Sequence, residues 1–174
     1  MHIIIDGYNL IRQSPSLWPF EERSLEEGRS ELIRRLSTFK KGRGHRITVV
    51  FDGWIGGSSK EERLTEHGIT VIYSKRGEQA DEVIKRMVRH GRSSIVVVTS
   101  DRSIADTATR CGGTAIPSPE FDLRLTMPPG NSTSFNDDLT DYDDEQVRLT
   151  GKRKGPSKRM PKKQRRVMAR LKKI

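Results

Sequence analysis

Residues 1–12, MHIIIDGYNLIR, contain the first strand of the predicted fold and its first candidate site residues. The apolar run at residues 3–5 is typical of a short buried strand, and it ends directly in the carboxylate of Asp6. Gly7 lets another group approach the backbone closely. The amide oxygen of Asn9 suits a metal ion, and its amide group also suits a hydrogen bond to a carboxylate. This grouping predicts a functional site where the strand ends.

Further along the chain, apolar runs alternate with stretches of helical periodicity. Strands are predicted at residues 47–51, 70–73, 95–99 and 114–116. Helices are predicted at residues 24–40, 61–67, 78–90, 103–111 and 117–125. This order predicts an α/β fold in which helices cover a mainly parallel sheet.

Three of the predicted strands end in an aspartate, at Asp6, Asp52 and Asp101. The carboxyl ends of parallel strands share one edge of the sheet, where open α/β folds bind ligands. Carboxylates crowded at this edge repel one another, and a bound cation such as Mg²⁺ or Mn²⁺ relieves the repulsion. The structural alternatives are a helix cap at Asp101 and a plain turn at Asp52.

Two further acids extend this pattern. Asp81 lies in the first turn of the helix predicted at 78–90, and Asp106 lies one turn into the helix that follows Asp101. The helix dipole favours an acid in a first turn, which is the structural alternative for Asp81. Both acids are candidates for the same carboxylate cluster.

Five motifs occur in a fixed order: DGYNLI at 6–11, FDG at 51–53, QADEVIKR at 79–86, SDRSIADTA at 100–108 and GGTAIPSPEF at 112–121. Together they resemble the NYN domain of the YacP-like ribonucleases, which belong to the PIN-like nuclease superfamily. The resemblance covers about residues 1–125. It implies a three-layer α/β/α PIN-like (NYN) fold, an acidic divalent-metal site and endonucleolytic cleavage of RNA.

The resemblance also implies roles for the residues at matching positions. The implied catalytic residues are Asp6, Asn9, Asp81 and Asp101. The implied metal-binding residues are Asp6, Asp52, Asp81, Asp101 and Asp106. Phosphodiester hydrolysis needs an activated water and relief of charge on the phosphate, and one or two Mg²⁺ or Mn²⁺ ions supply both. We expect Asp6 and Asp101 to be direct ligands, and Asn9 to orient Asp6 or to contact the substrate.

The charge of the chain is unevenly distributed. Its 33 Lys and Arg residues outnumber its 23 Asp and Glu residues, and residues 151–174 contain 12 of the basic residues and none of the acidic ones. We therefore predict a nuclease domain at 1–125, an acidic linker at 126–150 and a basic tail at 151–174 that is disordered or partly helical. The linker is either a solvated spacer or a segment that folds back and masks the tail.

Basic and aromatic residues are predicted to bind nucleic acid. Arg12 and Arg102 lie near the predicted site, and Trp54 follows Asp52 in a loop where its ring is placed to stack on an unpaired base. Solvated charges and a loop anchor are the alternatives. The tail binds phosphates by releasing counterions, unless it only aids solubility. Its predicted contacts are Lys152, Arg153, Lys154, Lys158, Arg159, Lys162, Lys163, Arg165 and Arg166.

The remaining composition narrows the class of protein. The single cysteine, Cys111, excludes an internal disulfide and a cysteine-rich zinc site. The sequence shows neither a signal peptide nor an apolar run long enough to span a membrane. We therefore expect a cytoplasmic protein with no membrane partner.

These observations predict a divalent-metal-dependent endoribonuclease with RNA as its partner. Bacterial YacP-like proteins are linked to RNA decay on the ribosome, so the resemblance makes the ribosome a second candidate partner. The alternative is a catalytically inactive RNA- or ribosome-binding module, which explains the tail without catalysis. A phosphatase with an aspartate nucleophile is disfavoured, because such enzymes usually show D-x-D after the first strand, where this chain has DGY.

Overall fold

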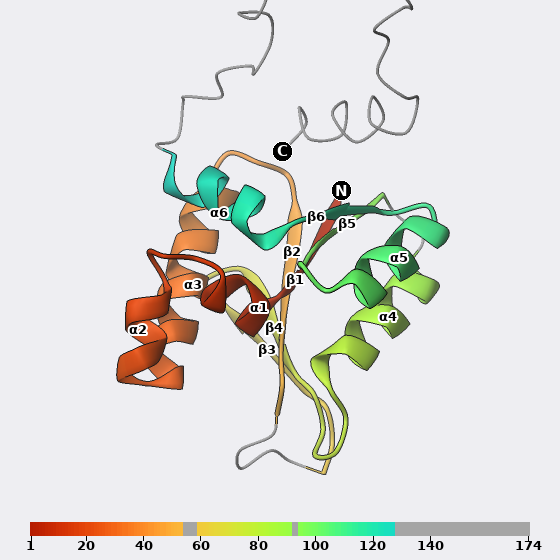
Figure 1. Cartoon of the computed structure of the whole chain (residues 1–174), viewed down its shortest axis with the longest axis horizontal. Coiled ribbons are helices and arrows are strands. Elements are labelled where there is room, and N and C mark those ends of the chain that lie inside the picture. Colours follow the sequence, from red (N-terminus) through yellow and green to blue (C-terminus); the bar gives the residue numbers. More distant parts are fainter. Residues whose placement is uncertain (54–58, 92–93, 128–174) are drawn as a thin grey trace, which may run out of the picture. The chain divides into compact units, whose positions relative to one another are not determined.

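The structure is a computed structural model that describes residues 1–53, 59–91 and 94–127 (Figure 1). Trp54, nearly all of the predicted acidic linker and the whole predicted basic tail lie outside the described residues, and with the tail all of its predicted nucleic-acid contacts. The described helices include none that is long and apolar enough to cross a membrane.

A six-stranded sheet with the order β3-β4-β2-β1-β5-β6 forms the centre of the fold. The strands are β1 (His2–Asp6), β2 (Arg46–Phe51), β3 (Glu62–Glu66), β4 (Ile69–Tyr73), β5 (Ile95–Val98) and β6 (Thr114–Ile116). All neighbouring strands pair in parallel except β3, which pairs with β4 in the antiparallel direction. The predicted mainly parallel sheet is confirmed.

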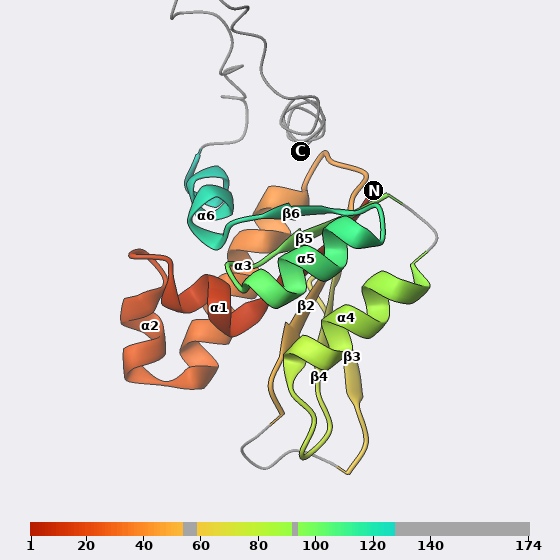
Figure 2. The ribbon, with the colours of Figure 1, turned by 45° about the vertical axis from the view of Figure 1, so that its right-hand side comes forward.

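Helices cover both faces of this sheet. They are α1 (Gly7–Arg12), α2 (Trp18–Arg23), α3 (Leu25–Lys40), α4 (Ala80–His90), α5 (Arg102–Arg110) and α6 (Ser118–Thr126). Figures 1 and 2 show α4 and α5 on one face, and α1, α2, α3 and α6 on the other. The predicted three-layer α/β/α architecture is therefore confirmed.

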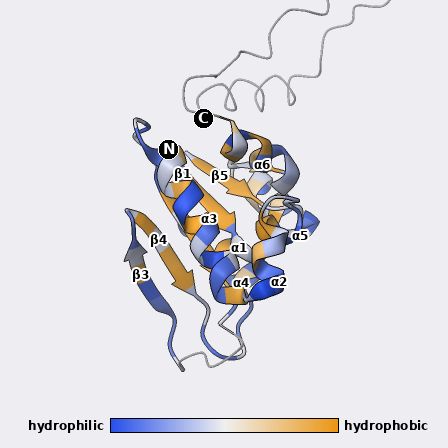
Figure 3. Ribbon diagram, turned by 90° about the vertical axis from the view of Figure 1, so that its left-hand side faces the viewer, coloured by the Kyte–Doolittle hydropathy of each residue, from blue (hydrophilic) through white to orange (hydrophobic). Residues whose placement is uncertain are grey.

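The alternation of side chains along each strand decides which residues face which helices. Ile4 of β1, Val50 of β2 and Val97 of β5 belong to the buried cluster formed with α4 and α5. Residues one position before or after them face the opposite layer. The central strands are apolar on both faces, as expected for a sheet covered by helices on both sides (Figure 3).

One predicted element is wrong. Residues 61–67, predicted as a short helix, contain the strand β3, whose side chains are mostly exposed. His67 and Gly68 link β3 to β4 and both have positive φ values, 48° and 77°, as in the two-residue turns that favour β-hairpins. The hydrophilic edge strand is largely blue in Figure 3, and its polarity concealed the hairpin in the sequence.

Two short helices on the α3 side of the sheet, α1 and α2, were not predicted. The helix α1 begins directly after Asp6, which accepts a hydrogen bond from the backbone N–H of Asn9 and so caps it. The longer helix α3 begins after Ser24, which caps it in the same way through the N–H of Glu27. The predicted start of the 24–40 helix is thus explained by this cap.

Candidate active site

The three strand-end aspartates lie on the α4/α5 side of the sheet. Asp6 lies two residues after Ile4, and Asp52 two residues after Val50, so both continue the face that packs against α4 and α5. Contacts agree with this direction: Asp52 Oδ1 accepts a hydrogen bond from the N–H of Ala80 at 2.6 Å, at the start of α4. The structure thus places the carboxylates at one edge and on one face.

Each strand-end aspartate uses one oxygen to cap a helix. Asp6 Oδ1 accepts from Asn9 N at 3.3 Å, and Asp101 Oδ1 accepts from Ile104 N at 2.9 Å at the start of α5. Gln79, the N-cap residue of α4, makes no capping hydrogen bond with its side chain, and Asp52 takes this role by accepting from the N–H of Ala80. The capping role expected as an alternative for Asp101 is therefore real, but it occupies only one oxygen. The second oxygens of Asp52 and Asp101 accept no hydrogen bond from the described residues.

Asp6 is the most buried member of the group, with 9% of its surface exposed. Its second oxygen accepts a hydrogen bond from Thr99 Oγ1 at 3.2 Å. Burial raises the pKa of Asp6 to about 6; the hydrogen bonds from Asn9 and Thr99 oppose the rise, and the charges of Asp81 and Asp52 add to it. The ionised form of Asp6 is therefore disfavoured by its surroundings.

Asp81 joins the cluster from the first turn of α4. Burial raises its pKa, the charges of Asp101 and Asp52 raise it further, and Lys85 lowers it. Lys85 Nζ lies 3.5 Å from Asp81 Oδ2, one helical turn away. Asp6, Asp52, Asp81 and Asp101 therefore influence one another electrostatically, as expected for acids gathered at one edge.

The side chains in their present rotamers do not form a preassembled metal cluster. Among the residues that the structure describes, no group of three or more His, Cys, Asp or Glu side chains is arranged to hold a metal ion. The chemistry of the donors nevertheless suits a hard divalent cation, because several carboxylates of like charge share one edge, and Asp52 and Asp101 each keep one oxygen that accepts no hydrogen bond from the described residues.

Asn9 fixes the local backbone through its side chain. Its Oδ1 accepts three hydrogen bonds, from the N–H of Ser100 at 2.9 Å, from Ser118 Oγ at 2.7 Å and from Gln13 Nε2 at 3.1 Å. This side chain therefore ties α1 to the loop before α5 and to the start of α6. Asn9 makes its hydrogen bond to Asp6 through the backbone N–H, and its Nδ2 donates to no described residue.

The glycines of the first two motifs permit close packing at the site. A Cβ atom on Gly7 would overlap the ring of Phe51, and one on Gly53 would overlap the carbonyl oxygen of Ser74. Gly53 N also donates to Ser74 Oγ at 3.0 Å. A side chain at Gly7 would push the end of β1, which carries Asp6, away from β2, and a side chain at Gly53 would push the residues after Asp52 away from the end of β4.

The other candidates are less closely placed. Asp106 is exposed on α5 and makes no hydrogen bond or ion pair with any described residue. Arg102 is exposed in the first turn of α5, beside Asp101. Arg12 forms an ion pair with Glu21, with 3.1 Å between Nε and Oε1.

Two residues of the site were not predicted from the sequence, Thr99 and Lys85. For Lys85, its spacing of four residues from Asp81 on a helix was the available signal.

Comparison with known proteins agrees with this architecture. The family model described as "YacP-like NYN domain" matches residues 3–173, a span that includes the acidic segment and the basic tail. "Uncharacterized protein YacP" of Bacillus subtilis (strain 168) is 34% identical over 102 residues, which make up 57% of this chain and 59% of that protein. The match thus spans less than two thirds of this curated relative.

Solved structures give the same result. The crystal structure of Rae1 (YacP) from Bacillus subtilis matches with a TM-score of 0.60 and 28% identity, over 72% of this chain and 73% of that chain. A crystal structure of a mutant form of the same protein matches with the same TM-score and identity, over 71% and 74%. The resemblance found in the motifs is therefore confirmed, and the chain belongs to the YacP-like NYN domain family.

Proposed function

We propose that this protein is a divalent-metal-dependent endoribonuclease that hydrolyses RNA phosphodiester bonds. Membership of the NYN family implies a nuclease-type function. One observation carries the finer proposal: the buried Asp6, with its pKa raised to about 6, shares a sheet edge with Asp52, Asp81 and Asp101. Among described residues, Lys85 is the one cation paired with any of these acids, so the cluster has more negative charge than the fold neutralises.

Carboxylate oxygens and the excess of negative charge in this cluster both suit a hard cation. Asp6, Asp81 and Asp101 would hold Mg²⁺ or Mn²⁺, and Asp52 would act as an outer ligand. When bound, the metal supplies an activated water and relieves the charge on the scissile phosphate. The helix caps and the Thr99 hydrogen bond restrain the carboxylates in advance.

Asn9 has a different role in this proposal. Because its Oδ1 already accepts three hydrogen bonds, it is a poor metal ligand. Its Nδ2 has no partner among the described residues and is therefore available to donate. We assign Asn9 Nδ2 as a donor to a non-bridging oxygen of the substrate phosphate. The assignments of Asp106 to metal, and of Arg102, Trp54 and the tail to RNA, remain proposals that rest on the sequence.

The decisive experiment compares RNA cleavage by the wild type and by Asp101→Asn, with Mg²⁺, with Mn²⁺ and with EDTA. Asparagine keeps the oxygen that caps α5 but removes the charge, so the fold is retained. We expect cleavage to require metal and to fall at least about 100-fold in the variant. Glu62→Gln removes an exposed carboxylate on β3 and serves as the charge-matched control with unchanged cleavage.

The second candidate function is an inactive RNA- or ribosome-binding module. It is favoured by the 12 basic residues of 151–174, which suit a polyanion whether or not the acids are catalytic. RNA binding without cleavage, both for free RNA and with translating ribosomes, would overturn the nuclease proposal in its favour. Cleavage that needs translating ribosomes would instead assign the ribosome as the partner.

A further inference from the structure

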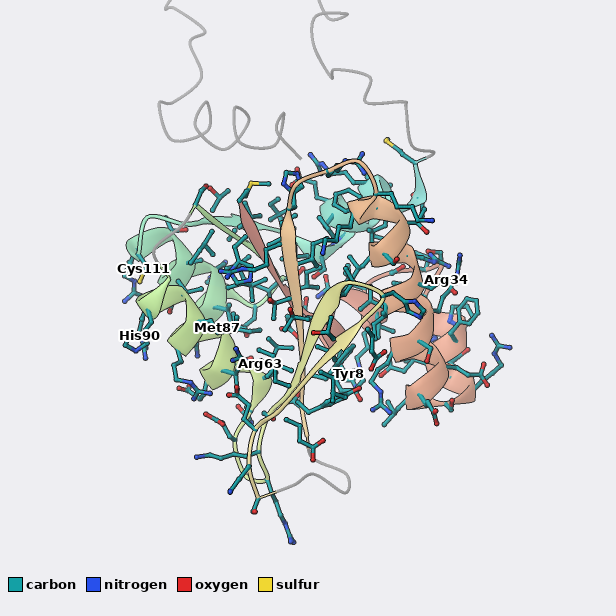
Figure 4. All side chains as sticks on the ribbon, turned by 180° about the vertical axis from the view of Figure 1, so that it is seen from behind. Tyr8, Arg34, Arg63, Met87, His90 and Cys111 are labelled. Carbon is teal, nitrogen blue, oxygen red and sulfur yellow. The ribbon has the colours of Figure 1, made fainter. Side chains whose placement is uncertain are left out.

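Three aromatic rings lie in a row at the carboxyl ends of β1, β2 and β4. The ring centroids of Tyr8 and Phe51 are 5.1 Å apart, and those of Phe51 and Tyr73 are 5.7 Å apart. Phe51 directly precedes Asp52 on its strand, so its ring faces the layer of α1 and α3, opposite the carboxylates. Figure 4 shows Tyr8 between the strand ends and the helices of this layer.

Arg29 of α3 lies over this row without an acidic partner. Its Nη1 donates to Tyr8 Oη at 3.0 Å, and its guanidinium carbon lies 5.6 Å from the centroid of the Tyr73 ring. No carboxylate of the described residues lies within ion-pair distance of it. By contrast, Arg34 and Arg35 on the same helix share Glu31. Arg29 is half-buried, and the donors of its guanidinium suit an anionic ligand.

Arg12 approaches Tyr8 from the end of α1. Its guanidinium carbon lies 5.2 Å from the Tyr8 centroid, and its Nε donates to Glu21 Oε1 at 3.1 Å. The Glu21 side chain is only 6% exposed, whereas that of Arg12 is 57% exposed. The two terminal nitrogens of Arg12 donate to no described residue, so the guanidinium is held at its inner side and open at its outer side.

Glu21 is held in place at a cost in stability. Its Oε2 is buried and, among the described side chains, is the one buried polar atom without a hydrogen-bond partner. Leaving such an atom unsatisfied costs about 1–3 kcal/mol. The burial of the Glu21 carboxylate is explained if Glu21 orients Arg12, because unfavourable local features such as an unsatisfied polar atom are expected at functional sites.

We propose that Arg12, over the ring of Tyr8, and Arg29, bonded to its hydroxyl, form a phosphate-binding site for the RNA strand on the face of the sheet opposite the carboxylates. The site holds a backbone phosphate of the strand that is cleaved, as that single strand bends over the sheet edge. Guanidinium groups bind phosphate oxygens in pairs. Tyr8 is only 9% exposed, so the site binds phosphate and does not stack a base. This inference rests on the proposed nuclease function for the position of the cleaved phosphate.

The test measures binding of the full chain to a short fluorescein-labelled oligouridine by fluorescence anisotropy, in EDTA and over a range of salt concentrations. We expect Arg12→Gln and Arg29→Gln each to weaken binding about fivefold and to flatten the salt slope by about 0.7. Arg110→Gln removes an exposed charge at the far end of α5 and is the matched control. Affinities and slopes equal to those of Arg110→Gln would overturn the proposal.

Glu21→Gln separates positioning from simple electrostatics. Removing a negative charge should strengthen RNA binding if Arg12 and Glu21 are merely surface charges. If Glu21 orients Arg12, the same substitution weakens binding about threefold, because a neutral amide holds the guanidinium less firmly. Tighter binding by Glu21→Gln would therefore contradict its assignment as a positioning residue.

Two controls keep the test independent of folding and of catalysis. Thermal unfolding checks each variant, and Arg29→Lys retains the charge if Arg29→Gln does not fold. Lysine lacks the planar fork that binds Tyr8 and a phosphate through separate nitrogens, so we expect about a twofold loss, and wild-type binding by this variant would overturn the role of Arg29. Because EDTA prevents metal-dependent cleavage, the binding measurement does not depend on catalysis. If the wild type does not cleave RNA with Mg²⁺ or Mn²⁺ but the arginine variants still lose binding in EDTA, the nuclease proposal is refuted and the phosphate site is retained.

Discussion

The two ends of β1 each bury an ionisable residue, and they differ in how it is satisfied. His2 is 6% exposed and Asp6 is 9% exposed, and both share the face of Ile4. Arg46 Nη2 lies 2.8 Å from His2 Nδ1. Because arginine only donates, Nδ1 accepts, and the protonated Nε2 donates to Thr48 Oγ1 at 2.9 Å. Burial and then Arg46 lower the pKa of His2 to about 4, so the neutral ring is fully satisfied.

Asp6, at the other end, is surrounded by groups that oppose its charge. It accepts hydrogen bonds from Asn9 and Thr99, yet burial and the charges of Asp81 and Asp52 raise its pKa to about 6. The two residues are similarly buried, but the partners of His2 suit its neutral ring, whereas the neighbours of Asp6 oppose its negative charge. A buried group with complementary partners stabilises the fold, whereas a buried group among like charges indicates a site that awaits a ligand.

The largest expected effect comes from Asp6→Asn. We expect RNA cleavage to fall at least about 100-fold, because a predicted metal ligand is lost. Without metal, the same variant should be more stable at pH 7.5 by about 1–3 kcal/mol, because the folded wild type must ionise a buried acid there. Cleavage assays and urea unfolding in EDTA measure the two quantities. A large loss of stability in EDTA would show that Asp6 is structural, as His2 is.

A smaller effect distinguishes the two ends by pH. Asp6 has a raised pKa, so its contribution to stability falls as pH rises from about 4 to 6. His2 has a lowered pKa, so its contribution falls as pH drops from about 6.5 to 4. Each contribution is worth about 3 kcal/mol, and in the wild type the two largely cancel. In a variant that lacks either residue, the free energy of unfolding should therefore change with pH as the remaining residue dictates.

Urea unfolding at pH 4.5 and pH 6.5 in EDTA tests this cancellation. Relative to the wild type, Asp6→Asn should gain stability with rising pH, and His2→Gln should lose it. The comparison uses slopes, so any cost of placing glutamine at a buried position does not affect the conclusion. Parallel pH profiles for the wild type and both variants would contradict the contrast between the two ends.

The sequence was sufficient for the features that depend on strand alternation. The runs that end in Asp6, Asp52 and Asp101 predicted both the parallel sheet and the edge where these acids lie. The hairpin of β3 was missed because an exposed edge strand lacks apolar residues, and its turn depends on positive φ values at His67 and Gly68.

Residues that act through tertiary contacts were beyond sequence reasoning. Asn9 was expected to orient Asp6 or to contact the substrate, and nothing in its sequence position indicated that its side chain bonds to Ser100 and Ser118, which are distant in the chain. Arg29 resembles any other charge on an amphipathic helix until Tyr8 and Tyr73 are placed beneath it. Spacing along a sequence identifies which residues share an edge, but not which partners complete them.

The smallest expected effect concerns Thr99, which links two of the acids. Its Oγ1 donates to Asp6 Oδ2 at 3.2 Å and accepts from Asp101 N at 3.0 Å. Thr99→Val keeps the shape but removes both bonds, so the pKa of Asp6 should rise further and the acid limb of the cleavage–pH profile should move up by about half a unit. Thr109→Val loses only a hydrogen bond within α5 and is the matched control. If both variants gave the wild-type profile, the Thr99 hydroxyl would not affect the pKa of Asp6. The difference between Asp6 and His2 would then come only from burial and from the charges around them.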